Sequence, residues 1–287
     1  MLKQISLSLA AIALLASCSV KEERLDCSAP VTVSVSGFNV SQEPFTKATS
    51  VASYDGVKHI TLAFYNTSGT EVFKKTQNKE SMPTGETFGE FTTSLPLGNY
   101  TMVVIANGGS NIPTLSGATE ASYGENVVGD TFATSQAVNI NSLDAVNLTA
   151  TLDRIVAFLA VNSTDGRIEQ AKKIRITTTT GSRSFNPTTG LATVNSGIIA
   201  NITQPEAVGT VTRSAVLLFL ASDEQSADVT LEILDADDQV LVQKTVTNVP
   251  LKRNRRTILS GALYSATASS GSFQVNNEWL SNYNQNF

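Results

Sequence analysis

Apolar and polar residues alternate in short runs along most of the chain, and this pattern most constrains the fold. The alternation is clear at residues 31–35, 60–64, 216–220 and 229–233. It places one face of a β-strand on a core and the other face in solvent. Turn-forming residues separate the runs, and no amphipathic helix of convincing length is present. The sequence therefore predicts an all-β fold made of one or two β-sandwiches.

The strand predicted at residues 98–107 differs from the others because both of its faces are apolar. Tyr100 and Met102 fall on one face, and Val103 and Ile105 fall on the other. A strand with two apolar faces is typical of a central position that is covered on both sides. We therefore expect this strand to lie in the middle of its sheet.

The spacing of the runs predicts the domain organisation. Residues 110–135 are rich in Gly, Ser, Thr and Asn, and we expect a surface connection there. The alternation restarts near residue 143, and a chain of 287 residues is long enough for two domains. The sequence thus predicts an N-terminal β-sandwich at residues 30–143 and a C-terminal β-sandwich at residues 144–287, which ends in a strand at residues 272–287.

The first residues read as an export signal. Lys3 precedes an apolar run, residues 5–16, that is too short to span a bilayer. The run ends in the sequence Leu-Ala-Ser-Cys at residues 15–18, which resembles the bacterial lipobox. That resemblance implies cleavage between Ser17 and Cys18 and acylation of Cys18. The alternative is an ordinary secretory signal that is followed by an incidental cysteine.

The lipobox implies a signal peptide at residues 1–17 and a lipidated tether at residues 18–29. The Lys-Glu-Glu sequence at residues 21–23 resembles the signal that sends lipoproteins to the outer face of the outer membrane in Bacteroidetes-type bacteria. The alternative is a solvated, charged linker. We expect a surface-exposed protein that is anchored to the outer membrane by its lipid.

Composition excludes some classes of partner and bond. The formal net charge of −5 argues against a nucleic-acid partner, since phosphate binding needs clustered cations. Hydrophobic residues make up 41% of the chain, which is enough to build a core. If Cys18 is acylated, Cys27 is the one remaining cysteine, and no internal disulfide can form.

No pattern of residues predicts catalysis, a cofactor or a metal. His59 is the sole histidine, so any Ser-His-Asp or Cys-His triad would have to use it, and a zinc site would lack its usual ligands. Asp235, Asp237 and Asp238 lack the glycine and the distal glutamate of an EF-hand loop, so they predict a hairpin turn. We expect a protein that is not an enzyme and holds no metal and no cofactor.

One basic cluster stands out, formed by Lys252, Arg253, Arg255 and Arg256. It can be a charged start of a strand that keeps a sheet edge soluble. It can also contact a partner subunit or anionic headgroups. The sequence leaves both interpretations open.

Several segments together resemble a known family. They are residues 97–107 (LGNYTMVVIAN), 152–157 (LDRIVA), 252–264 (KRNRRTILSGALY) and the terminal segment 273–279. With the lipobox, their order is similar to that of the fimbrillin lipoproteins of Bacteroidetes-type (type V) pili, the Fim/Mfa-like family. The resemblance implies two tandem transthyretin-like β-sandwich domains. It also implies a non-catalytic role in building or anchoring a surface fimbrium by β-strand addition to other subunits.

The resemblance also frames the choice of subunit. In stalk subunits, an arginine-directed protease trims the first strand; the matching position here is Lys47-Ala48, with lysine in place of arginine. The charged tether that ends at residues 24–27 is closer to the FimB/Mfa anchor-type subunits. We therefore expect an anchor or accessory subunit, and the alternative is a polymerising stalk or tip subunit that is trimmed near residue 47. A different class, a surface lipoprotein that binds a glycan or a host or bacterial ligand, stays open as well.

The C-terminal tail is a candidate donor strand. Phe273, Val275 and Trp279 follow a linker of small residues at 265–272. Such a strand can satisfy an open sheet edge of another subunit while its large side chains fill pockets. Alternatively, the tail pairs within its own second domain.

Overall fold

The protein is described by a computed structural model, which covers residues 27–40, 49–51, 55–265 and 274–276. Within these ranges the regular structure consists of β-strands and one short 3-10 helix, η1 (Lys79–Ser81). The prediction of an all-β fold is confirmed. None of the described residues form a helix that is long and apolar enough to cross a membrane.

The first half of the chain forms an eight-stranded sheet. Its order is β2-β1-β10-β9-β6-β3-β4, with β5 paired to β1. The strands are β1 (Ser28–Val40), β2 (Thr49–Val51), β3 (His59–Asn66), β4 (Glu71–Asn78), β5 (Glu90–Pro96), β6 (Gly98–Asn107), β9 (Thr131–Ile140) and β10 (Val146–Arg154). All of these strands except β2 and β4 contribute buried side chains to one core, so the sheet folds over that core.

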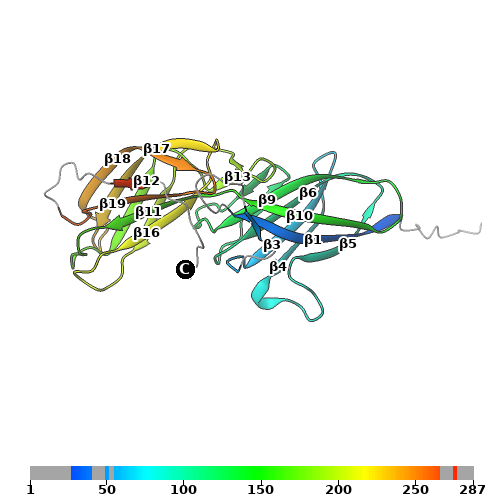
Figure 1. Cartoon of the computed structure of the whole chain (residues 1–287), viewed down its shortest axis with the longest axis horizontal. Coiled ribbons are helices and arrows are strands. Elements are labelled where there is room, and N and C mark those ends of the chain that lie inside the picture. The colour runs from blue at the N-terminus through cyan, green and yellow to red at the C-terminus, as the bar shows by residue number, and fades with distance from the viewer. Residues whose placement is uncertain (1–26, 41–48, 52–54, 266–273, 277–287) are drawn as a thin grey trace, which may run out of the picture.

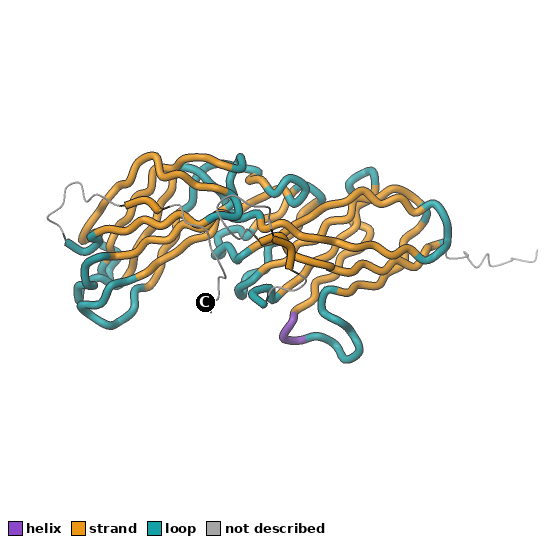
Figure 2. The backbone as a smooth tube through the Cα atoms, viewed as in Figure 1, coloured by secondary structure: helices purple, strands orange, loops and turns teal. Residues whose placement is uncertain are grey.

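The second half contains two four-stranded sheets that face each other across a second core. One sheet has the order β16 (Arg213–Leu218), β11 (Ala157–Ser163), β19 (Arg256–Gly261), β20 (Gln274–Asn276). The other has the order β15 (Ile199–Thr203), β12 (Lys173–Thr178), β17 (Glu224–Leu234), β18 (Val240–Lys252). Figures 1 and 2 show the two halves as lobes placed one after the other in an elongated molecule.

A small fourth sheet joins the two halves. Its order is β14 (Leu191–Ala192), β13 (Ser184–Asn186), β8 (Glu120–Ser122), β7 (Thr114–Gly117). The segment predicted as a surface connection at residues 110–135 therefore supplies two strands and the start of β9. Its Leu115, Ala121 and Tyr123 side chains are buried in a third core that also contains Phe185 and Phe219 from the second half. The prediction of a surface connection was wrong because strands this short need few apolar residues, so their composition resembles that of a loop.

The strand β6 lies between β3 and β9, in the middle of its sheet. Met102 and Val104 face the first core, whereas Val103 and Ile105 face the third core. The prediction that both faces of this strand are covered is confirmed. One apolar face of β6 packs in the core of the first half, and the other packs in the third core, where the two halves meet.

The strand β10 belongs to the sheet of the first half. It pairs in parallel with β1, with Val31 opposite Val146 and Asn39 opposite Asp153. The sequence assigned these residues to a C-terminal unit that starts at residue 144. The restart of alternation near residue 143 marks the start of a strand, but it does not say which sheet that strand joins, because pairing is decided in three dimensions.

Candidate functional site

The first strand of the described residues, β1, occupies a slot between two other strands. On one side, β1 pairs in antiparallel fashion with β5, from Ser28 opposite Pro96 to Ser34 opposite Glu90. On the other side it pairs in parallel with β10. Both edges of β1 are therefore hydrogen-bonded along much of its length, although it lies near the N-terminus. The register shifts between Val35 and Gly37, where the β10 ladder is irregular.

Side chains also hold β1 in this slot. Val31 and Val33 are buried in the first core, and Phe38 makes an edge-to-face contact with Phe132 at a ring distance of 5.3 Å. The Asn39 amide donates a hydrogen bond of 2.6 Å to an Asp153 carboxylate oxygen on β10. Burying Val and Phe side chains stabilises a fold by about 1.5–3 kcal/mol each. Removal of β1 would therefore expose an apolar groove between β5 and β10.

The predicted processing sites all lie outside the described residues. Ser17 and Cys18 precede the described part, and Lys47 and Ala48 fall in the segment 41–48 that links β1 to β2. The structure describes β1 before this segment and β2 after it. Acylation, signal cleavage and trimming stay predictions.

The tail is paired within its own chain over three residues. Strand β20 runs antiparallel to β19, with Val275 opposite Leu259. Phe273 and Trp279, the other two candidate anchors, lie outside the described residues. This pairing agrees with the interpretation in which the tail joins its own second half. Donation to another subunit would require this short strand to leave β19.

The basic cluster lies at the turn between β18 and β19, beside a groove of about 360 Å³ that includes Glu224, Pro250 and Arg255 in its lining. Lys252 forms an ion pair with Glu224, and Arg253 pairs with Asp223 at 2.7 Å.

The other two cations of the cluster are partly withdrawn from water. The Arg256 guanidinium stands 5.2 Å from the centre of the Phe158 ring, and burial lowers the pKa of Arg255. Ion pairs hold Lys252 and Arg253 at the turn before β19. A contact between this cluster and a partner remains a separate hypothesis.

The described residues contain no group of three or more His, Cys, Asp or Glu side chains that could hold a metal ion. The turn at residues 235–239 is held by Asp235, whose carboxylate accepts hydrogen bonds from the backbone of Asp237 and Gln239. Lys173 donates to Asp238 at 2.7 Å and lowers the pKa of that carboxyl group. These contacts account for the three aspartates as parts of a turn.

His59 is a buried polar residue at the start of β3. Its side chain is 7% exposed, and its Nδ1 atom has no hydrogen-bond partner among the described residues. Burial is the main cause that lowers the pKa of His59, and the nearby Lys58 adds to the effect, while Glu80 opposes it. The neutral imidazole is therefore favoured in the folded state.

This lowered pKa predicts how stability depends on pH. The unfolded chain takes up a proton near pH 6.5, whereas the folded chain resists it, so the stability contributed by neutral His59 is present above about pH 6.5 and is lost as the pH falls below that value. We expect His59→Gln to flatten the fall in unfolding free energy between about pH 7.5 and 5.5. Urea unfolding at several pH values measures this. Equal slopes in both proteins would contradict it.

Two features of the structure, the slot around β1 and the burial of Arg167, have no visible signal in the sequence. The slot around β1 needs β10, which lies more than a hundred residues further along the chain. The buried Arg167 donates to several backbone carbonyls of two loops, including that of Ala171 at 2.5 Å. A lone arginine in a polar segment gives no hint of burial.

Comparison with known proteins places the chain in one family and finds solved structures with a similar fold. The model of a family of unknown function, DUF6562, matches residues 25–286. No curated protein matches the sequence. A solved structure described as a candidate adhesin from Bacteroides thetaiotaomicron is 11% identical, with a TM-score of 0.53, over 88% of this chain and 97% of that one.

Two further solved structures are similar at comparable identity. A candidate adhesin from Bacteroides ovatus is 13% identical, with a TM-score of 0.50, over 77% of this chain and 82% of that one. The fimbrial anchor protein Mfa2 from Porphyromonas gingivalis is 10% identical, with a TM-score of 0.49, over 90% of this chain and all of that one. The likeness to the two adhesin structures shows a shared fold.

Proposed function

The chain belongs to the family of unknown function DUF6562, and we propose that it is a non-catalytic structural subunit, an anchor or accessory subunit, of a cell-surface fimbrium. In this proposal the protein is tied to the outer face of the outer membrane by acyl chains on Cys18. It joins other fimbrial subunits by β-strand addition. Two structures that share its fold are described as adhesins, which supports a role at the cell surface.

The observation that carries the anchor role is the clamped position of β1. Strand β1 begins ten residues after Cys18, so it is the first described element that a pull on a lipid anchor would load. It is hydrogen-bonded to β5 and β10 on its two edges, and its Val31 and Val33 side chains are buried. Extraction would break two ladders at once, and each hydrogen bond contributes about 0.5–1.5 kcal/mol net. A strand held in this way is suited to transmit force from a filament to the membrane.

We also propose a division into two transthyretin-like sandwich domains, with the first extended to the end of β10. The separate cores of the two halves support this division. The boundary then falls at Ile155 and Val156, which are buried in the third core between the halves. In this proposed division the strand at residues 146–154 belongs to the N-terminal domain.

A second candidate function is that of a polymerising stalk or tip subunit. The connection that follows β1, residues 41–48, contains Lys47, and a cut there would separate β1 and its lipid from the rest of the sheet. The slot between β5 and β10 could then accept a strand of another subunit, such as one that carries Phe273, Val275 and Trp279. This role would use the same slot only after β1 has left it, so processing at Lys47 decides between the two roles.

The deciding experiment is mass spectrometry of the mature N-terminus in outer-membrane fractions. An anchor subunit is expected to start at an acylated Cys18, whereas a start near Ala48 would indicate a trimmed stalk or tip subunit. The variant Cys18→Ala should leave the membrane fraction, and Cys27→Ala, which changes the exposed second cysteine, should stay in it. Equal membrane association of both variants would contradict lipid anchoring.

Assembly through the tail is tested separately. Deletion of residues 272–287 should leave a folded protein that no longer joins filaments, because the donor strand is gone. Normal assembly of the truncated protein would contradict donation by the tail and would favour its pairing with β19.

A further inference from the structure

Two turns and the start of β1 form one end of the first half, here called the β1-start pole (Ser28, residues 96–98 and residues 141–145). Pairing brings these segments together, because Ser28 lies opposite Pro96 and Gly98 lies opposite Ile140. The pole lies at the right-hand end of the molecule in Figure 1, away from the second half.

The β1-start pole presents two leucines to solvent. Leu97 is 49% exposed and Leu143 is 53% exposed, each in a turn where polar residues are usual. Asp144 is the one charged residue of the pole, although the whole chain carries a net charge of −5. The pole is therefore apolar at its tips and nearly uncharged around them.

Hydrogen bonds hold the two turns in place. The Tyr100 hydroxyl donates to the Pro96 carbonyl at 2.8 Å, which fixes the turn that carries Leu97. The Ser142 hydroxyl donates to the Asp144 carboxylate at 3.0 Å, which fixes the turn that carries Leu143. An Asn139–Asn99 side-chain hydrogen bond of 2.5 Å joins the strands that lead to these turns. The leucines are thus presented by ordered turns, so little conformational entropy is lost when they are buried.

The length of the tether restricts what can cover this pole. Nine residues lie between Cys18 and Ser28, and the ten Cα–Cα steps that join the two span at most about 33–36 Å when fully extended. An acylated Cys18 therefore keeps the pole close to the lipid surface at all times. Because the tether keeps the effective concentration of the lipid surface near the pole high, even a weak contact between the two is populated. A nearly uncharged tip also approaches an anionic leaflet with little repulsion.

We propose that the β1-start pole docks on the lipid surface, with Leu97 and Leu143 entering the boundary between headgroups and acyl chains. This inference rests on the lipid anchoring in the proposed function. Docking adds two apolar side chains to the acyl chains as membrane contacts. It also orients the molecule, so that the second half points away from the membrane and towards other subunits.

The test uses the full-length, acylated protein in vesicles of phosphatidylethanolamine and phosphatidylglycerol, in a Cys27→Ser background. An environment-sensitive fluorophore is placed at Leu143→Cys, and as a matched control at Val208→Cys, an equally exposed site at 56% in a loop of the second half. We expect the probe at position 143 to shift to the blue and to be shielded from iodide. The probe at position 208 should do neither.

A second change tests the leucine partner. Leu97→Asp in the protein labelled at position 143 should shift the equilibrium towards the undocked state about tenfold. Val127→Asp, at a valine that is 73% exposed but lies outside the pole, should have no effect.

The outcomes separate this inference from the proposed function. An unmodified Cys18 would overturn the lipid anchor itself. An acylated protein that floats with vesicles but shows equal quenching at both probes would overturn docking alone. Shielding that arises only when other fimbrial subunits are added would also overturn docking on lipid and would assign the pole to a protein partner.

Discussion

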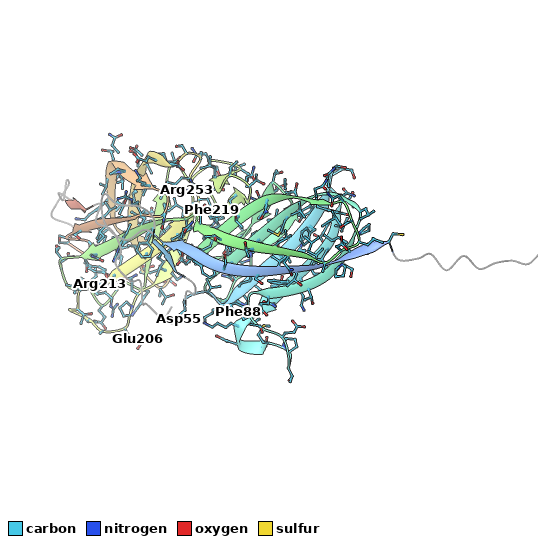
Figure 3. The ribbon with its side chains drawn as sticks, turned by 45° about the vertical axis from the view of Figure 1, so that its right-hand side comes forward. Asp55, Phe88, Glu206, Arg213, Phe219 and Arg253 are labelled. Atoms are coloured by element: carbon cyan, nitrogen blue, oxygen red, sulfur yellow. The ribbon has the colours of Figure 1, made fainter. Side chains whose placement is uncertain are left out.

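Replacing Phe219 by alanine is expected to lower the free energy of unfolding by about 3–5 kcal/mol. Phe219 is fully buried, and its ring stacks on Phe185 at 4.2 Å and on Tyr123 at 6.2 Å. Tyr123 comes from the first half and the other two come from the second half, so the cluster couples the halves. Figure 3 shows Phe219 near the middle of the molecule.

The expected loss has two parts. The transfer of a large apolar ring from water is lost, and a cavity remains because Phe219 is held by backbone hydrogen bonds of 3.0 Å to Ser182 in both directions. The backbone at position 219 therefore cannot shift to let the neighbouring rings close the gap. Urea unfolding, followed by fluorescence and circular dichroism, measures the change.

The matched control is Phe88→Ala. Phe88 is half-buried at the margin of the first core, so its loss should cost much less. We also expect Phe219→Ala to separate the unfolding of the two halves into distinct transitions, because the third core is their shared contact. A loss below about 1 kcal/mol with one sharp transition would show that this ring does not couple the halves.

Replacing Arg167 by methionine is expected to have a similarly large effect, about 3–5 kcal/mol, because the charge-assisted hydrogen bonds of a buried guanidinium would be lost, including one to the buried carbonyl of Ala171. The Arg167 side chain is 3% exposed. Its guanidinium donates to the carbonyls of Ala171 at 2.5 Å, Ile168 at 3.1 Å and Ala207 at 3.3 Å, and also to that of Glu206. One side chain thus holds the loop after β11 against the loop that connects β15 to β16.

Methionine keeps much of the volume of arginine but donates no hydrogen bond, so the change isolates the lost donors. The control is Arg213→Met, at an exposed arginine on β16 that Figure 3 labels in the second half. Thermal and urea unfolding measure stability, and limited proteolysis reports whether the loop at residues 204–212 opens. Equal free energies of unfolding for the two arginine variants would contradict the prediction, because they would show that water replaces the hydrogen bonds of the Arg167 guanidinium at no cost.

Only some of the predicted site residues lie among the described residues. The candidate tail strand is found paired with β19 at Val275, while Phe273 and Trp279 lie outside the described residues. Lys252 and Arg253 of the basic cluster form ion pairs, which the sequence could not foresee because Glu224 and Asp223 approach them only through the pairing of β17 with β18.

The sequence by itself determined the class of fold and the faces of its strands. Alternation with a period of two fixes which side chains of β1 and β6 are buried, because successive side chains of a strand point to opposite faces. The lipobox and the turn at Asp235 are equally local patterns, and they can be read without a structure.

Tertiary structure alone decided the partners of each strand. The same alternating run can join either half, so the neighbour of β10 became known only from its parallel register with β1. The sheet that joins the halves and the burial of Arg167 likewise depend on contacts between segments far apart in the chain. Such contacts depend on the register and position of distant strands, and a local pattern of apolar and polar residues carries no information about either.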